Sequence, residues 1–242
     1  VFQQVQVQSP RLQMGYQQPF LFGSPFGVDF SFDGFKKDTS FLNINLQLGV
    51  QYSFGGNKSG KIFYQQFISN LLDVDTNAIR NNKRLPDQID QTTSNIGIEY
   101  EWFNTDYRFN PRKGIDMKLT GSAGIRRIRQ NNNISNIKDL SNPGFNFQSL
   151  YDSLGTKAYT FRFRGNVAKY FKTGKQTTFK TALNVGLVQS PRIFRNELYQ
   201  IGGFRLLRGF DEESIFASAY AVVTAEYRIL IGLNSYLYAF TD

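Results

Sequence analysis

One stretch of the sequence has the spacing of a phosphate-binding loop. Gly55, Gly60 and Lys61 fit the pattern of a glycine, four arbitrary residues, a second glycine and a lysine. A functional loop of this kind continues with a magnesium-binding serine or threonine and opens a helix. Here Ile62 stands at the magnesium-binding position, and the residues that follow alternate like a strand. The segment therefore predicts a glycine-rich turn without nucleotide binding.

Histidine and cysteine are absent from the 242 residues. Without imidazole, Ser-His-Asp and Cys-His catalysis and histidine-ligated metal sites are excluded. Without thiolates, zinc ribbons, iron–sulfur clusters and disulfides are excluded as well. The sequence thus favours a protein that is not an enzyme and that holds no metal or cofactor.

The elements that position the remaining polar residues are long strands. Residues 42–53 alternate strictly between apolar and polar side chains, a pattern that indicates a strand with one apolar face. No helical segment is expected to interrupt the strands. Similar alternation predicts ten strands, near residues 3–18, 26–37, 41–54, 60–70, 94–107, 115–129, 158–171, 177–189, 219–231 and 235–242.

Composition and link lengths together indicate a membrane β-barrel. No apolar run approaches the roughly 20 residues of a membrane helix, yet 16% of the residues are aromatic. The links 71–93, 130–157 and 190–218 are long and leave one end of the sheet, whereas most other links are short. Outer-membrane barrels have the same asymmetry between their two ends. We predict an all-β fold, a transmembrane antiparallel up-and-down β-barrel.

The alternation also predicts which side chains contact lipid and which face the lumen. The soluble alternative, a sandwich or lipocalin-like barrel, fits less well because its strands usually have only about five or six residues. The expected lipid-facing residues are Leu42, Ile44, Leu46, Leu48, Phe161, Phe163, Leu183 and Val185. The expected lumen-facing residues are Asn43, Gln47, Arg162, Arg164 and Lys180.

The chain is expected to form a single partial outer-membrane barrel domain over residues 1–242. No linker or change in composition divides it, and its strand pattern still continues at Asp242. An open sheet in lipid would leave unpaired backbone groups, each costing several kcal/mol. The ten strands are therefore interpreted as part of a larger barrel.

A basic run at Arg126, Arg127 and Arg129 could suggest nucleic-acid binding. Its position at a strand end instead favours contact with lipid phosphates or solvent. We therefore expect no nucleic-acid partner. The net charge of +9 would suit anionic lipopolysaccharide and acidic client proteins alike.

Several motifs resemble those of the BamA/TamA-type outer-membrane assembly family, also called bacterial surface antigens. The resemblance implies a barrel of about sixteen strands, with further strands on both sides of this chain and periplasmic repeat domains outside it. It also implies that a long loop folds back into the barrel. The matching residues are Gly202, Gly203, Arg208, Gly209 and Phe210 in that loop, Asn110, Pro111 and Gly114 in a turn, Glu226 in the following strand, and Phe240 and Asp242 in the next.

Glu226, Asp242 and Phe240 are expected to meet Arg208 in the lumen. Glu226 shares a strand face with Thr224 and Arg228, and Asp242 shares one with Phe240. Two carboxylates in a poorly solvated interior repel each other unless a cation joins them, and a guanidinium has five donors for that purpose. The resemblance implies that Arg208 supplies this cation, that Gly209 permits the tight backbone and that Phe210 packs at the wall.

The resemblance further implies a function in the bacterial outer membrane. The chain would insert or translocate other β-barrel proteins, with the Arg-Gly-Phe loop bracing the lumen. The implied partners are outer-membrane lipids and lipopolysaccharide, unfolded outer-membrane client proteins, and accessory lipoproteins or periplasmic subunits. A two-partner-type secretion pore and a passive porin-like channel are the alternatives.

Overall fold

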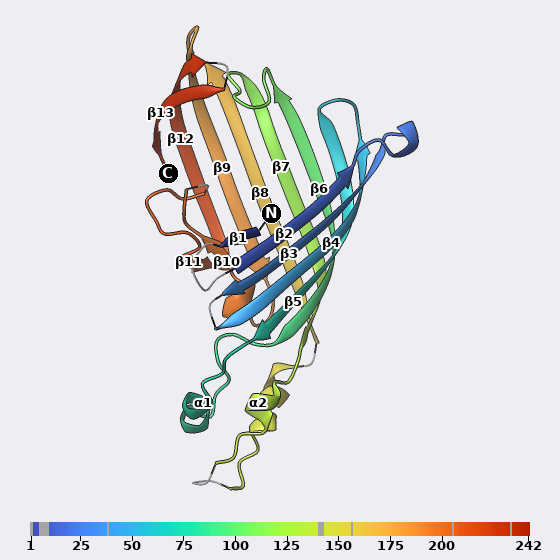
Figure 1. The fold of residues 1–242 in the computed structure, drawn as a ribbon, viewed down its shortest axis with the longest axis vertical. Coiled ribbons are helices and arrows are strands. Elements are labelled where there is room, and N and C mark those ends of the chain that lie inside the picture. The colour runs from blue at the N-terminus through green and yellow to red at the C-terminus, as the bar shows by residue number, and fades with distance from the viewer. Residues whose placement is uncertain are drawn as a thin grey trace.

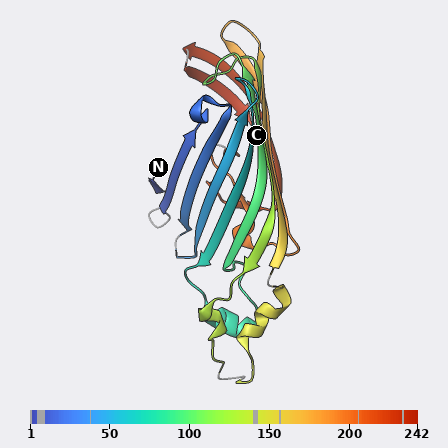
Figure 2. The same ribbon diagram turned by 90° about the vertical axis from the view of Figure 1, so that its right-hand side faces the viewer.

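The protein forms one curved antiparallel sheet that is open along one side (Figure 1). The computed structural model describes residues 2–4, 10–37, 39–139, 143–155, 157–204, 206–232 and 234–242. Eleven strands follow one another in the order β1 to β9, β12 and β13, and a separate hairpin pairs β10 with β11. Neighbours in the sequence are thus neighbours in the sheet, as in an up-and-down barrel that does not close within the described residues. Figure 2 shows its curvature from the side.

The strands are long, and they match the alternating segments of the sequence. Their bounds are β1 (Phe2–Gln4), β2 (Pro10–Gln18), β3 (Phe26–Lys37), β4 (Phe41–Ser53), β5 (Lys58–Leu71), β6 (Gln91–Thr105), β7 (Gly114–Ile128), β8 (Lys157–Lys172), β9 (Thr177–Gln189), β10 (Tyr199–Ile201), β11 (Ile215–Ala217), β12 (Ala219–Gly232) and β13 (Ser235–Thr241). Ten of these correspond to the ten expected strands.

The first expected strand, 3–18, was wrong as a single element. Its described part consists of two strands, because Phe2 pairs with Leu12 and Gln4 with Pro10 in antiparallel register. Residues 5–9 lie outside the described residues. Pro10 has no amide hydrogen to donate, and the start of a strand is where proline is tolerated.

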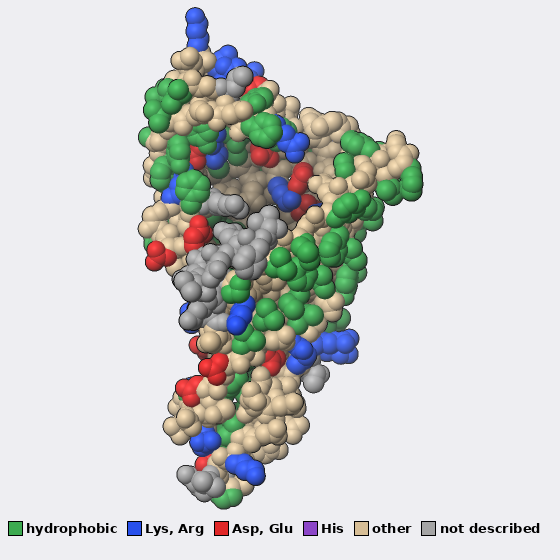
Figure 3. Space-filling model, viewed as in Figure 1, with side chains coloured by type: hydrophobic (Ala, Val, Ile, Leu, Met, Phe, Trp, Pro, Cys, Tyr) green, Lys and Arg blue, Asp and Glu red, His purple; other side chains and the backbone are tan. Residues whose placement is uncertain are grey.

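The expected separation of the two sheet faces is confirmed by the strand register. On the outer face, apolar residues of neighbouring strands lie opposite one another from β4 to β8. These successive cross-strand partners are Leu48, Tyr64, Ile96, Ala123 and Phe161. Leu48 is 59% exposed and Ile96 is 67% exposed, although both are apolar. Figure 3 shows hydrophobic side chains of this face over the N-terminal strands, whose outer side is turned toward the viewer.

The polar face lines the inside of the curve. Asn43 accepts a hydrogen bond from the Ser69 hydroxyl, and Lys180 pairs with Glu226 on the next strand. Lys61 lies 2.8 Å from the Glu99 carboxylate, which Lys118 also approaches to 3.1 Å. Ion pairs therefore connect neighbouring strands on the inner face.

Replacing Leu48 with arginine is expected to destabilise the barrel in a bilayer by about 2–4 kcal/mol, because the charge would enter the apolar band. Gln47→Arg is the matched control, since its side chain points to the lumen one residue earlier. The measurement is the urea midpoint of the full-length protein in lipid vesicles. Equal losses for the two variants would contradict the assignment of faces.

Short helices, which the alternation did not predict, lie in the connections between strands, and no helix interrupts a described strand. They are η1 (Leu21–Gly23), α1 (Thr76–Asn82), α2 (Asn132–Ser135), η2 (Phe147–Leu154) and η3 (Arg195–Glu197). Local caps explain two of them: the Asp75 carboxylate accepts from the Ala78 amide at 2.9 Å, and the Asn131 side chain accepts from the Asn133 amide at 2.9 Å. Alternation at period two gives no signal for such brief turns.

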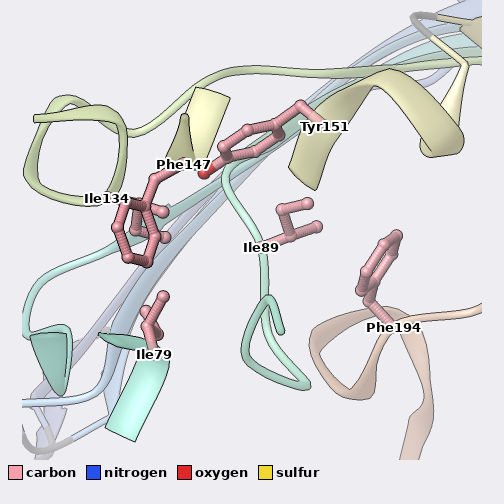
Figure 4. Close-up of a cluster of buried hydrophobic side chains, with 6 residues drawn as sticks. All are labelled: Ile79, Ile89, Ile134, Phe147, Tyr151 and Phe194. Atoms are coloured by element: carbon pink, nitrogen blue, oxygen red, sulfur yellow. The ribbon is translucent and has the colours of Figure 1, made fainter. Parts of the chain in front are cut away.

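Three long links pack together beyond the strand ends and bury a small core of their own (Figure 4). The described residues 72–90, 129–139 and 143–155 form most of this region, which we call the cap, and Phe194 enters it from the link after β9. The buried members of the cap core are Ile79, Ile89, Ile134, Phe147, Tyr151 and Phe194.

The glycine-rich segment after β4 is a turn, as the sequence predicts. Gly55 has φ 103°, the Phe54 amide donates to the Lys58 carbonyl at 2.9 Å, and β5 begins at Lys58. Among the described residues, no helix is long and apolar enough to cross a membrane.

Candidate functional site

The link between β9 and β12 carries the matching glycines and Arg208. It includes η3 and the β10–β11 hairpin, and Figure 1 shows it in front of the inner face of the sheet. Gly202 and Gly203 have φ 116° and 93°, and Gly209 has φ 91°. A Cβ on Gly203 would collide with the Glu212 carboxylate. The loop therefore favours glycine at all three positions for their backbone conformation, and at Gly202 and Gly203 also for lack of space.

Arg208 joins the two carboxylates that the sequence places on neighbouring strands. Its guanidinium lies 2.7 Å from an Asp242 oxygen and 3.0 Å from a Glu226 oxygen. The Arg208 amide and Nε also donate to the second Asp242 oxygen, at 3.0 and 2.8 Å. The side chains of Asp242 and Glu226 are 3% and 7% exposed, so the pairing is largely shielded from water.

Further side chains fix this arrangement. The Thr224 hydroxyl donates to Asp242 at 2.8 Å, and Arg228 donates twice to Glu226, at 2.8 and 2.6 Å. Hydrogen bonding to Asp242 raises the pKa of Arg208 above its ordinary value. The loop arginine is therefore a permanent cation held by two anions.

Of the two aromatic residues expected beside Arg208, Phe240 contacts it, whereas Phe210 differs from the expectation. The guanidinium carbon of Arg208 lies 3.6 Å from the centroid of the Phe240 ring, a cation–π contact. The Phe210 side chain is 54% exposed, so the expectation that it packs at the wall was wrong. The Phe210 carbonyl instead accepts from the Gly203 amide at 3.1 Å, which closes the loop on itself. This backbone hydrogen bond fixes the position of Phe210, which remains about half exposed.

A polar cavity of about 530 Å³ lies between the loop and the sheet. Arg208 and Glu226 line it, together with Lys118, Asp116 and Tyr170. Val167, Phe204 and Leu206 also line it, so its walls combine charged and apolar side chains.

The root of the loop is held by a buried ion pair that sequence reasoning missed. Arg126 on β7 lies 2.6 Å from the Glu197 carboxylate, and these side chains are 1% and 3% exposed. The same carboxylate accepts from the Phe194 amide at 2.8 Å. The expectation that Arg126 meets lipid phosphates or solvent was therefore wrong, because the side chain of this residue points inward. Its neighbour Arg127 is exposed on the outer face.

Asn196 adds a second buried contact at the loop root. Its amide nitrogen donates to the Ser69 hydroxyl at 2.7 Å and to the Ile89 carbonyl at 2.9 Å. The Glu197 carbonyl also accepts from Arg162 at 2.8 Å. The only sequence signal for these contacts was the polar character of the segment.

A third attachment joins the loop to the opposite part of the sheet. Glu213 lies 3.0 Å from Arg11 on β2, and Arg11 also pairs with Asp33 on β3 at 2.6 Å. Glu213 has φ 54°, which is uncommon for a residue with a side chain. The loop thus contacts β2 on one side and β13 on the other, close to both edges of the open sheet.

The expected Asn-Pro-x-x-Gly turn lies at the opposite end of the sheet from the cap. Gly114 begins β7 with φ 120°, where a Cβ would collide with the Asn104 carbonyl. Asn110 and Pro111 are buried in the turn. The Asp106 carboxylate accepts from the Arg112 and Lys113 amides, at 2.8 and 3.0 Å. The structure therefore assigns these residues to a tight connection between β6 and β7.

Asp106 is expected to make this turn sensitive to acid. Partial burial raises the pKa of Asp106, but hydrogen bonds from the Lys113 and Arg112 amides outweigh it and hold the pKa below its ordinary value. A lowered pKa stabilises the fold above the ordinary carboxyl pKa of about 4 and loses that effect as pH falls through the folded pKa. The stability difference between the parent and Asp106→Asn should therefore shrink on acidification. Urea midpoints measured from neutral to acidic pH test this, and a constant difference would contradict it.

Comparisons with known proteins agree with this architecture. A family model described as the Omp85 superfamily domain matches residues 4–242. The fold is similar to the crystal structure of BamA from Haemophilus ducreyi lacking POTRA domains 1-3, with TM-score 0.56 and 12% sequence identity over 92% of this chain and 45% of that chain. The chain thus spans less than half of that structure, and no curated protein matches it. Because the family model covers nearly all of the sequence, the chain belongs to the Omp85 superfamily.

Proposed function

We propose that the protein containing this chain inserts or translocates other β-barrel proteins at the bacterial outer membrane. Its loop between β9 and β12 would brace the lumen while a client strand engages the barrel. The proposed partners are unfolded outer-membrane proteins, lipids and lipopolysaccharide, and accessory lipoproteins or periplasmic subunits. The activity would be non-enzymatic and would need no cofactor.

The observation that carries the proposal is the set of three attachments of this loop to the inner face. The Glu197–Arg126 pair holds its root, the Glu213–Arg11 pair holds one side, and Arg208 holds its tip against Asp242 and Glu226. A loop attached at three places resists displacement, so the sheet beside it keeps its shape when other parts of the barrel open. Membership of the Omp85 superfamily supports the same class of function.

A secretion pore of the two-partner type is the nearest alternative, since it would use the same loop. A passive porin is less well supported, because the attached loop occupies the space that solutes would cross. In a porin, loss of Arg208 would raise conductance without affecting other membrane proteins.

Reconstitution of the full-length protein in lipid vesicles tests the proposal. The expected result is faster folding of an added unfolded outer-membrane protein, and a slower rate with Arg208→Ala than with the parent. Ion conductance measured on the same vesicles separates assembly from a channel. Release of a soluble passenger across the membrane, without folding of the added barrel protein, would favour the secretion pore.

A further inference from the structure

The turn between β2 and β3 is unusually apolar for a connection. It reads Pro19-Phe20-Leu21-Phe22-Gly23-Ser24-Pro25, and no charged residue occurs between Arg11 and Asp29. Turns exposed to water are normally built from polar residues and glycine. The β6–β7 connection at the same end of the sheet carries Asp106, Arg108, Arg112 and Lys113.

The backbone of this turn holds two aromatic rings away from the protein. Phe20 and Phe22 have φ 55° and 52°, a left-handed conformation that is rare for bulky residues. The Gly23 amide donates to the Phe20 carbonyl at 3.1 Å, and the Ser24 hydroxyl donates to the Leu21 carbonyl at 2.7 Å. Phe22 is nevertheless 98% exposed and Phe20 is 58% exposed. Strain of this kind persists where surrounding contacts enforce it, and such sites are often functional.

The exposed rings continue the apolar outer face of the barrel. Phe26, Tyr52 and Phe54 form a ladder of ring contacts at the adjoining strand ends, with centroids 5.0 and 4.9 Å apart. Figure 1 shows the turn projecting outward beyond β3, and Figure 3 shows hydrophobic side chains on the projection. Aromatic rings are favoured where membrane hydrocarbon meets headgroups.

We propose that Phe20, Leu21 and Phe22 form an interfacial anchor that inserts into the membrane leaflet at the short-turn end of the barrel. The occupant of this surface is lipid, because the anchor is uncharged and is continuous with the lipid-facing band. Binding of a protein partner through the same rings is the alternative. The proposal rests on the membrane placement of the proposed function. It adds that the anchor fixes how deeply strands β2 and β3 sit in the membrane.

Site-directed fluorescence on the full-length protein tests the anchor. Single cysteines replace Phe22, Leu48 or Phe109 in a background without other cysteines, and each carries a bimane label. Leu48 reports whether the barrel lies in the bilayer. Phe109 is 78% exposed in the charged β6–β7 connection and is the matched control. Vesicles contain lipids brominated near the headgroup end of the acyl chains, and iodide is the aqueous quencher.

The expected result is a loss of fluorescence at positions 22 and 48 with brominated lipid, and at position 109 with iodide only. A label at position 22 that iodide quenches and brominated lipid does not, while position 48 responds to lipid, would overturn the anchor alone. A label at position 22 shielded from both quenchers would indicate a protein contact and would also overturn it. If position 48 fails to respond to lipid, the membrane placement itself falls, and the anchor with it.

Discussion

Replacing Arg208 with alanine is expected to destabilise the barrel by on the order of 3 kcal/mol, because the shielded Asp242 carboxylate would lose its cation, whereas Glu226 would keep Arg228 and Lys180. Asp242 and Glu226 are 3% and 7% exposed in their side chains, so both carboxylates are largely desolvated in the folded protein. The readouts are the temperature at which the folded full-length barrel loses its heat-modifiable mobility and the rate of client assembly.

Two further variants make this expectation specific. Arg208→Lys should restore only part of the stability, because an ammonium cannot make the planar contact with two carboxylates. Arg112→Ala is the matched control, since its ion pair with Asp106 at 3.5 Å is well exposed and such surface pairs contribute little. An Arg208→Ala protein as stable and active as its parent would contradict the role assigned to the loop tip.

Replacing Arg126 with alanine is expected to have the larger effect on stability, about 3–5 kcal/mol, the range for breaking a buried ion pair. The Glu197 carboxylate would remain buried with the Phe194 amide as its main donor. Its neighbour Asn196 would then carry more of the attachment of the loop root. The urea midpoint of the full-length protein in vesicles measures the loss.

The adjacent arginine offers a close control for this change. Arg127 lies on the outer face and is exposed, so Arg127→Ala should change the midpoint little. Combining Arg126→Met with Glu197→Gln should recover much of the stability, because no unpaired charge stays buried. Equal effects of the Arg126 and Arg127 single variants would rule out the buried pair as a determinant of stability.

The strands were the most predictable part of the fold. Alternation at residues such as Leu48 and Gln47 follows from the pleat of a strand, which depends only on local sequence. The outer and inner faces could therefore be assigned before the register was known. The contacts of Arg208 were expected because its motif could be matched to acids on two successive strands.

The loop root and the Glu213 attachment could not be predicted, for a physical reason. Arg126 meets Glu197 across 71 residues, and Arg11 meets Glu213 across 202, so no local pattern relates them. Basic side chains at a strand end look alike in sequence whether they face inward or outward. Neighbouring residues of a strand point to opposite faces of the sheet, so a difference of one position decides whether a side chain faces lipid or the lumen. Arg126 points inward for this reason and pairs with Glu197.

The cap core has a consequence for recognition from outside the cell, if the long links face outward as in other outer-membrane barrels. Its surface is assembled from three segments that are distant in sequence, and Phe194 joins the third segment to Ile79 and Ile134 of the others. An antibody or bacteriophage that binds this surface would meet a composite epitope. Peptides copied from one link would lack the neighbours that shape it, so immunisation with the folded barrel should raise antibodies that such peptides do not absorb.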